Sequence, residues 1–397
     1  MKIEDPHALH LPLSERAKNM KSSAIRDLLK VTARPEIISF AGGLPSPDTF
    51  PIARLKDAFD RVLSAQGKVA LQYGPTDGYA PLREWIADRM STDGVRIGPE
   101  QVTIVSGSQQ GLDLLSKVLI DKGSKVLVET PTYLGALQAF SMYEPDLQSV
   151  ESDDIGLVPE TVARIGQGAR LLYAPPNFQN PTGRTLPLSR RRELVAICAR
   201  MNVPIIEDDP YGELSYGGER LQKMLTMNSA GVVHMGSFSK ILTPGIRLGY
   251  VIAPPALSRM LEKAKQATDL HTSQLTQMVV YEALKDGFLD QHIPVIRRLY
   301  AEQCETMLAA MQDFFPPALK WTRPDGGMFI WVTLPRHIDS QQLFEESVAQ
   351  DVAFVPGTPF YPANLATNTL RLSFVTVPRP RIREGIERLG KLIASKL

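Results

Sequence analysis

The sequence predicts an α/β protein with a mostly parallel sheet between helices, joined to a smaller α+β domain. From about residue 100, short apolar, β-branched runs alternate with longer helical patterns, as in strand–helix–strand units. Most of these runs are continuously apolar, which is typical of strands covered on both faces. A long helical stretch near residue 290 ends this alternation, and shorter strand patterns follow it.

Residues 1–50 are expected to belong to the smaller domain and to cover the site. Within them, residues 22–31 hold a short amphipathic helical pattern, with Ile25, Leu28 and Leu29 on one face. The Gly- and Pro-rich stretch 35–51 follows, and we expect a loop there because these residues interrupt helices.

Residues 51–290 are expected to form the large domain. Its predicted strands lie in the runs 101–107, 125–131, 170–176, 203–209, 232–239 and 248–254. Helical patterns such as 111–120 and 189–201 lie between them. In open α/β sheets, ligands bind outside the carboxyl ends of the strands, so we expect the chemistry there.

Residues 291–397 are expected to form the smaller domain together with the N-terminal segment. The helical pattern 290–315 leads into the strand-like runs 326–335, 352–357 and 369–377, and an amphipathic helix ends the chain. The boundary near residue 290 follows from this change of pattern.

The composition excludes several classes of protein. The 397 residues include 44 basic and 43 acidic side chains, a net charge of +1, which favours neither nucleic acid nor an anionic membrane as partner. No apolar stretch approaches the ~18 residues of a membrane span, and the N-terminus lacks the apolar core of a secretory signal. Cys198 and Cys304 lack metal-ligand spacing. We expect a cytoplasmic protein with reduced thiols and no metal.

The strand ends predict an anion site. Gly107 and Ser108 lie at a strand-to-helix turn, where the first helix amides have no intrahelical partners and the helix dipole favours an anion. Ser108 alone is equally well explained as a helix cap. Ser237, Ser239 and Arg247 add two hydroxyls and a fixed positive charge, which together suit a phosphate dianion.

Lys240 and Asp208 add reactive groups at neighbouring strand ends. A lysine in this position is commonly a solvated surface residue, but a desolvated lysine near other cations can attack a carbonyl and form a Schiff base. Asp208 emerges from the apolar run 203–209 and needs a partner. If the carbonyl compound were pyridoxal phosphate, Asp208 could pair with its protonated pyridine nitrogen.

Four motifs in order give the chain a family resemblance. They are SFSKILTPGIRLGY at 237–250, NPTG at 180–183, DDPY at 208–211 (numbered from the first Asp) and RLSF at 371–374. Together they resemble the fold-type I pyridoxal-phosphate enzymes, aminotransferase class I/II, over nearly the whole chain. The stretches 22–51, 71–85 and 107–115 are similar to the branch with 2-aminoadipate and kynurenine aminotransferases. Pro210 replaces the alanine of the usual D-x-A-Y motif, as it does in that branch.

The resemblance implies a seven-stranded sheet and a role for each candidate residue. Lys240 is implied as the Schiff-base lysine and general acid/base, and Asp208 as the pyridine partner. Asn180 and Tyr211 would bind the cofactor's phenolate oxygen, and Tyr133 would cover the ring. The implied phosphate ligands are Ser108, Gln109, Ser237, Ser239 and Arg247. Arg371, with Asn180 and Gly43, would bind the substrate. Tyr73 would reach the phosphate of a second subunit, which implies a homodimer with shared active sites.

The implied reaction is a ping-pong transfer of an amino group from an L-amino acid to a 2-oxo acid, 2-oxoglutarate being the expected acceptor. The donor is expected to be 2-aminoadipate or an aromatic or branched-chain amino acid. Arg26 is a candidate for binding a distal carboxylate, although a solvated helix arginine explains it equally well.

Two alternatives use the same fold. A lyase, decarboxylase or synthase would share the lysine and the cofactor. A regulator would add a DNA-binding domain, but the chain starts at the segment that resembles the family's own N-terminus, so we expect none. Nucleotide-binding fingerprints of the P-loop and dinucleotide types are absent from the sequence.

Overall fold

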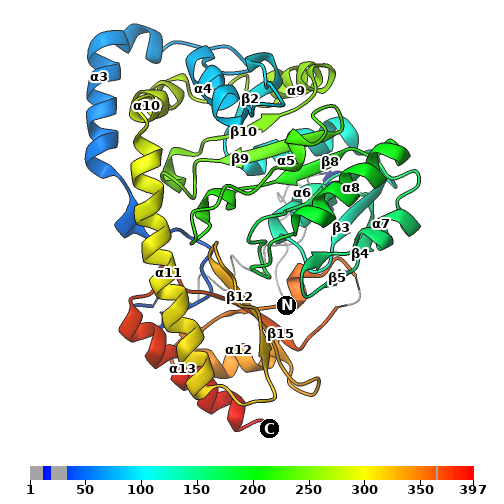
Figure 1. The fold of residues 1–397 in the computed structure, drawn as a ribbon, viewed down its shortest axis with the longest axis vertical. Helices are drawn as coiled ribbons and strands as arrows, with labels where there is room; N and C mark the ends of the chain where they lie inside the picture. Colours follow the sequence, from blue (N-terminus) through cyan, green and yellow to red (C-terminus); the bar gives the residue numbers. More distant parts are fainter. Residues whose placement is uncertain (1–11, 19–33, 364) are drawn as a thin grey trace, which may run out of the picture.

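The computed structural model describes residues 12–18, 34–363 and 365–397. A seven-stranded sheet with the order β2-β10-β9-β8-β7-β3-β4 forms its centre (Figure 1). In sheet order the strands are β2 (Val102–Val105), β10 (Gly249–Ile252), β9 (Val232–Ser237), β8 (Ile205–Asp208), β7 (Leu171–Ala174), β3 (Lys125–Glu129) and β4 (Asp146–Val150). Only β10 runs antiparallel to its neighbours in this sheet. The predicted α/β class with a mostly parallel, seven-stranded sheet is confirmed.

Helices cover both faces of this sheet because successive side chains of each strand enter different apolar clusters. Val126 and Val128 of β3 belong to one cluster and Leu127 to the other. The first face is covered by α5 (Ser108–Leu119), α6 (Leu134–Ser141) and α9 (Pro255–Thr268). The second is covered by α4 (Ala80–Met90), α7 (Pro159–Ile165) and α8 (Leu188–Met201). This double burial explains why the strands read as continuously apolar.

A second sheet has four antiparallel strands in the order β11-β12-β15-β14. They are β11 (Lys320–Trp321), β12 (Phe329–Thr333), β15 (Thr369–Ser373) and β14 (Val355–Pro356). The helices that pack with this part are α11 (Phe288–Phe314), α12 (Ser340–Val348) and α13 (Arg379–Ala394). In Figure 1 this part lies below the large sheet, and α11 runs alongside both.

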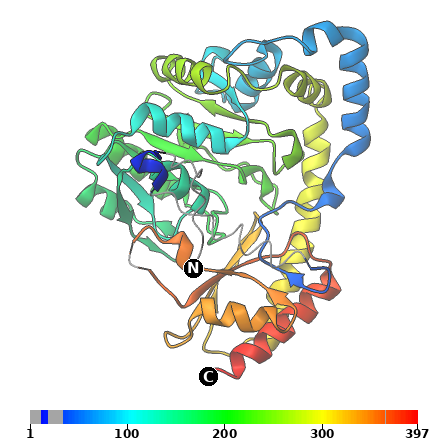
Figure 2. The ribbon, with the colours of Figure 1, turned by 180° about the vertical axis from the view of Figure 1, so that it is seen from behind.

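The N-terminal segment joins this C-terminal part. β1 (Ile38–Ser39) pairs in parallel with β13 (Val352–Ala353), and Phe40 continues the pairing on both sides. The amide of Phe40 donates to the carbonyl of Ala353, and its own carbonyl accepts from the amide of Ser373. Figure 2 shows this segment beside α13. The smaller α+β part is therefore built from both chain ends, as predicted.

The remaining elements are short, apart from α3 and α10. The helices α3 (Ile52–Ala70) and α10 (Gln274–Leu284) pack against each other beside α4. The short ones are α1 (Glu15–Lys18), the hairpin of β5 (Ser152–Asp153) and β6 (Gly156–Leu157), and the 3₁₀ turns η1 (Pro47–Thr49), η2 (Pro99–Gln101), η3 (Gly212–Leu214), η4 (Met224–Thr226), η5 (Pro244–Ile246) and η6 (Thr358–Phe360).

The division into 1–50, 51–290 and 291–397 stays a prediction. The helix α11 starts before residue 290 and continues without interruption beyond it, with Leu289 and Ile293 both buried. A change of sequence pattern therefore coincides with the first turn of a helix that packs along both parts of the chain.

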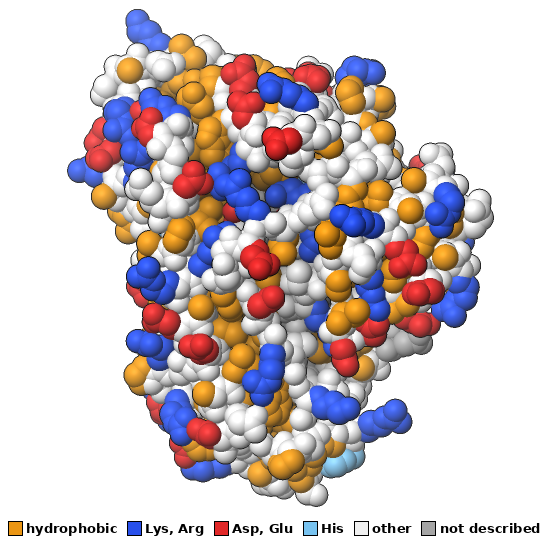
Figure 3. All heavy atoms as spheres, viewed as in Figure 1, with side chains coloured by type: hydrophobic (Ala, Val, Ile, Leu, Met, Phe, Trp, Pro, Cys, Tyr) orange, Lys and Arg blue, Asp and Glu red, His pale blue; other side chains and the backbone are white. Residues whose placement is uncertain are grey.

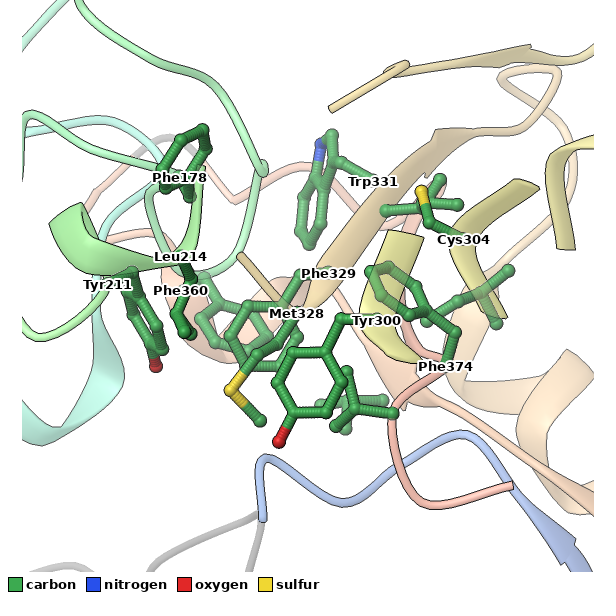
Figure 4. Packing of buried hydrophobic residues seen from close by; sticks show 14 of the residues in the cluster. Phe178, Tyr211, Leu214, Tyr300, Cys304, Met328, Phe329, Trp331, Phe360 and Phe374 are labelled. Carbon is green, nitrogen blue, oxygen red and sulfur yellow. The ribbon is translucent and has the colours of Figure 1, made fainter. Parts of the chain in front are cut away.

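Aromatic side chains join the two sheets where loops of the large one meet the small one. The rings of Tyr211 and Phe329 meet edge to face, with centroids 5.8 Å apart. A Cβ atom at Gly327 would lie 2.4 Å from the Cβ of Phe178, so only glycine allows this approach. Figure 4 shows Phe178 and Tyr211 beside Phe329 and Phe360 in this cluster. The packing holds the loop ends of the large sheet against β12.

Charged side chains of both signs are interspersed over the face in Figure 3. Over the described ranges, no helix combines the length and apolar character that crossing a membrane requires. Within the same ranges, no group of three or more His, Cys, Asp or Glu side chains is placed to hold a metal ion.

Arg191 provides a test of how the fold is held together. Its side chain is 2% exposed and donates to the carbonyls of Leu186, Gln222 and Pro176 and to Oδ1 of Asn177. Arg191→Met should lower the free energy of unfolding by about 2–4 kcal/mol, because the buried acceptors lose their donor. Denaturant midpoints followed by circular dichroism measure this.

The exposed neighbour Arg192 is the matched control for this substitution. Arg192→Met should change the unfolding free energy by less than about 0.5 kcal/mol. Equal midpoints for the two variants would contradict the role assigned to Arg191.

Candidate active site

A cavity of about 500 Å³ lies at the carboxyl edge of the large sheet, where the four-stranded sheet meets it. The predicted site residues that line it are Gly43, Ser108, Gln109, Tyr133, Asn180, Asp208, Tyr211, Ser237, Ser239, Lys240, Arg247 and Arg371. The structure therefore brings together residues that are up to 328 positions apart in the sequence, from Gly43 to Arg371.

One end of the cavity can hold an anion. Gly107 has a φ of 85° and precedes the first residue of α5, Ser108. A Cβ atom at Gly107 would lie 2.4 Å from Nη2 of Arg247, so the guanidinium packs directly on this turn. The free amides of the first turn of α5, this guanidinium and the hydroxyls of Ser237 and Ser239 all border the cavity. Such a donor set suits a phosphate dianion.

Gln109 and Tyr133 are positioned at the same end. Gln109 Nε2 donates to the carbonyl of Gly135 at 2.9 Å, which ties α5 to α6. A Cβ atom at Gly135 would come within 2.5 Å of the Tyr133 ring, so glycine lets the ring lie against the start of α6. Tyr133 itself precedes α6 in extended conformation and lines the cavity.

Lys240 is one of the residues that line the cavity. Its Nζ donates to the carbonyl of Gly43 at 2.8 Å and lies 5.9 Å from the ring centroid of Tyr211. Burial, together with the positive charges of Arg371 and Arg247, lowers the pKa of Lys240 to about 8. A substantial fraction of this amine is therefore neutral, and nucleophilic, near neutral pH.

Asp208 ends β8 with one oxygen satisfied and one unsatisfied. Its Oδ2 accepts a hydrogen bond of 2.6 Å from the hydroxyl of Tyr173, whereas its buried Oδ1 has no partner among the described residues. Burial, with a contribution from Asp209, raises the pKa of Asp208 to about 6. A carboxylate in this environment requires an N–H donor or a positive charge from a bound molecule.

Arg371 in β15 marks the opposite end of the cavity. It is 1% exposed, its Nη1 donates to Oδ1 of Asn180 at 2.7 Å, and its Nη2 donates to the carbonyl of Ala41 at 2.8 Å. Its Cζ lies 4.4 Å from the ring centroid of Phe329 and 5.3 Å from that of Phe360. Burial lowers the pKa of Arg371 to about 10. Within the described chain no carboxylate forms an ion pair with it, so this end suits a substrate anion.

Tyr73 is a predicted site residue that does not line this cavity. Tyr73 is 78% exposed and lies in a separate hollow beside His271, whose ring centroid is 5.7 Å from that of Tyr73. The structure therefore does not bring Tyr73 to the site of its own chain. Arg26 lies outside the described residues.

Sequence reasoning missed several residues of the cavity wall. They are Leu44, Leu134, Gly135, Gln138, Tyr173, Pro175, Pro210 and Pro244. Tyr173 carried a usable signal. It is the one polar side chain in the apolar stretch 171–176, and a buried hydroxyl at a strand end needs a hydrogen-bond partner.

Comparison with known proteins places this geometry in a family. The family described as aminotransferase class I and II matches residues 35–389. An aromatic-amino-acid aminotransferase 1 of Thermococcus litoralis is 42% identical over 97% of this chain and 94% of its own length.

Two solved structures share the fold over almost the whole chain. An alpha-aminoadipate aminotransferase of Thermus thermophilus, complexed with N-(5′-phosphopyridoxyl)-L-leucine, has a TM-score of 0.90 and 42% identity over 96% of this chain and 97% of its own. A kynurenine aminotransferase of Pyrococcus horikoshii has a TM-score of 0.92 and 41% identity over 97% of each chain. The chain belongs to the class I and II aminotransferases, the pyridoxal-phosphate enzymes of fold type I.

Proposed function

We propose that this aminotransferase moves the amino group of L-2-aminoadipate or of an aromatic or branched-chain L-amino acid to a 2-oxo acid, with 2-oxoglutarate as acceptor. One observation carries the assignment of roles. A lysine of lowered pKa lines the same cavity as a buried arginine and a buried carboxylate oxygen, and among the described residues the arginine has no carboxylate partner and the oxygen has no donor. The similar proteins are named as aromatic-amino-acid, alpha-aminoadipate and kynurenine aminotransferases, and one is complexed with a phosphopyridoxyl derivative of L-leucine, which supports the choice of donors.

The cofactor is pyridoxal 5′-phosphate, and the residues present fit it. The unpaired Oδ1 of Asp208 suits the protonated pyridine nitrogen, and the close approach of Arg247 to Gly107 forms a cradle for the phosphate. The phosphate would be held by Ser108, Gln109, Ser237, Ser239 and Arg247. When bound, the cofactor withdraws electrons from the bond to the substrate's α-hydrogen.

The chain's own residues perform the remaining tasks. Arg371 holds the substrate's α-carboxylate with the help of Asn180, which fixes the orientation of the Cα–H bond. Lys240 Nζ, once free of the cofactor, takes the proton from the substrate's Cα as general base and later donates it as general acid. Asn180 and Tyr211, which line the cavity, would bind the cofactor's phenolate oxygen, and Tyr133 would cover its ring.

Two further assignments concern the substrate's surroundings. The carbonyl of Gly43 accepts from Lys240, and a Cβ atom at this position would lie 3.9 Å from Nη2 of Arg371. We assign Gly43 to the border of the substrate's carboxylate for this reason. Arg26 is assigned to a distal carboxylate of the donor.

We further propose a homodimer in which Tyr73 reaches the cofactor phosphate of the second copy. Tyr73 is directed away from its own cavity, in a hollow of about 500 Å³. Exposed apolar side chains lie near it in the sequence at the end of α3, where Val69 is 55% and Leu71 72% exposed. A second copy of the chain would remove this apolar surface from water.

A panel of amino donors tests the proposed function. With 2-oxoglutarate or pyruvate as acceptor, the enzyme should form one 2-oxo acid for each donor consumed, from 2-aminoadipate, aromatic or branched-chain donors. Coupled assays of both products measure this. Donor consumption with release of carbon dioxide or ammonia, and no amino transfer, would favour the lyase or decarboxylase alternative.

The lowered pKa of Lys240 predicts how the apoenzyme captures its cofactor. At a pKa of about 8 the amine is protonated below that pH and neutral above it, so about a tenth is neutral at pH 7. With an ordinary lysine pKa the fraction would be below about one in a thousand. The rate of covalent capture should rise with pH and level off above about pH 8, as stopped-flow absorbance can follow.

Lys240→Ala is the control for this profile. It should lack both the absorption band of covalently bound cofactor and transaminase activity. A rate that keeps rising to pH 10, or covalent capture by the variant, would contradict the assignment.

Removal of the buried guanidinium should affect both half-reactions. Arg371→Ala should raise the KM for the amino acid and for the 2-oxo acid by about 10- to 100-fold, because each presents the same carboxylate. Arg371→Lys keeps the charge without the planar guanidinium, so its KM values should lie between those of the wild type and of Arg371→Ala. Steady-state kinetics with each substrate varied in turn measures this, and unchanged KM values would remove Arg371 from the site.

A further inference from the structure

Glu129 is a buried carboxylate outside the wall of the cavity. It ends β3, is 4% exposed, and accepts two hydrogen bonds. Its Oε1 accepts from the hydroxyl of Ser152 at 2.8 Å, and its Oε2 accepts from Nε2 of Gln179 at 3.0 Å. The proposed reaction has no role for this carboxylate, although β3 belongs to the sheet that carries the site and lies between β7 and β4.

Gln179 is 1% exposed, and its side chain makes four hydrogen bonds. Its Nε2 donates to Glu129 and, at 2.8 Å, to the carbonyl of Pro131. Its Oε1 accepts from the amide of Thr182 at 3.0 Å and from the hydroxyl of the same residue at 2.5 Å. All donors and acceptors of this amide are used, so its orientation is determined.

This amide connects two loops that carry site residues. Pro131 lies two residues before Tyr133, at the end of β3, and Gln179 immediately precedes Asn180. Asn180 in turn accepts from Nη1 of Arg371. A side chain behind the cavity therefore links the residue proposed to cover the cofactor ring with the one proposed to hold both cofactor and substrate.

The loop around Asn180 also rests on the four-stranded sheet. A Cβ atom at Gly183 would lie 2.4 Å from the carbonyl oxygen of Phe329 in β12, so the loop backbone is in close contact with that strand. On its other side, hydrogen bonds from the side-chain amide of Gln179 attach this loop to the end of β3. The position of Asn180 thus depends on both attachments.

We infer that Glu129 and Gln179 are positioning residues, which fix Asn180 and Tyr133 relative to each other for cofactor and substrate binding. This inference rests on the proposed function, because it concerns the roles assigned there. Glu129 orients the amide of Gln179, and that amide holds Pro131 and the turn ending at Gly183 in place.

The surroundings of Glu129 indicate which substitution should be tolerated. Burial raises the pKa of Glu129 to about 7. The hydrogen bonds from Ser152 and Gln179 and the charges of Arg184 and Arg190 act in the opposite direction and lower it. Both arginines are already paired with carboxylates of the β5–β6 hairpin. A neutral Gln at position 129 can still accept from Gln179 and donate to Ser152, so Glu129→Gln should preserve the arrangement.

The decisive comparison uses two buried glutamines. Gln179→Leu should raise the KM for donor and acceptor about tenfold and weaken the affinity of the apoenzyme for pyridoxal phosphate about tenfold, through misplacement of Asn180 and Tyr133. Gln303 is 5% exposed and donates to the carbonyls of Val375 and Val377, away from the cavity. Gln303→Leu should lower the Tm comparably but leave KM and cofactor affinity unchanged.

A charge exchange keeps the test informative if Gln179→Leu does not fold. Gln179→Glu places two carboxylates together and should produce the same losses, whereas Glu129→Gln alone should not. The double variant with Gln179→Glu and Glu129→Gln again has one amide and one carboxylate. Its KM values for both substrates should return most of the way to those of the wild type. The carbonyl of Pro131 would still lack its donor, so the affinity for pyridoxal phosphate should recover less.

Each outcome is distinguishable from failure of the proposed function. A wild-type enzyme without transaminase activity would overturn that function, while cofactor affinity still reports on the positioning. An active wild type with unchanged KM and cofactor affinity in Gln179→Leu would overturn the inference. Equal losses in Gln303→Leu, or no recovery in the combined variant, would overturn it as well.

Discussion

The site depends on three buried or partly buried ionisable groups that share a cavity without neutralising one another. Arg371, Lys240 and Asp208 line the same cavity, yet each is held by neutral partners of the chain instead. Arg371 donates to the carbonyl of Ala41 and to the side chain of Asn180. Lys240 donates to the carbonyl of Gly43, and Asp208 accepts from the hydroxyl of Tyr173. Direct pairing of opposite charges would occupy the groups that are proposed to bind substrate and cofactor. The arrangement therefore leaves these groups available to bound molecules.

The topology explains how these groups remain apart. Asp208 and Lys240 come from ends of neighbouring parallel strands, whereas Arg371 comes from the middle of β15 in the other sheet. The aromatic cluster of Phe178, Tyr211 and Phe329 holds the two sheets at a fixed separation. Because each charge belongs to a different rigid element, none can move toward another without disturbing packed side chains.

Much of this could be predicted from the sequence, for identifiable reasons. Six of the seven strands of the large sheet are buried on both faces, and their apolar runs stand out. β4 was not predicted because its sequence Asp-Leu-Gln-Ser-Val is polar and partly exposed, unlike that of β2 at the opposite edge. Lys240 and Arg371 were predicted as site residues because their motifs are distinctive, and both line the cavity. Tyr173, Glu129 and Gln179 were not assigned roles, because hydrogen bonding across strands depends on register, which sequence patterns do not specify.

The contact between Arg371 and the carbonyl of Ala41 joins residues 330 positions apart. During synthesis, the large sheet and Lys240 emerge from the ribosome well before β15, so the carboxylate end of the site cannot form on the nascent chain. Completion of this enzyme's active site therefore coincides with the meeting of its two chain ends. A truncated product would retain most of the groups proposed to bind the cofactor but lack Arg371, the group proposed to hold the amino acid.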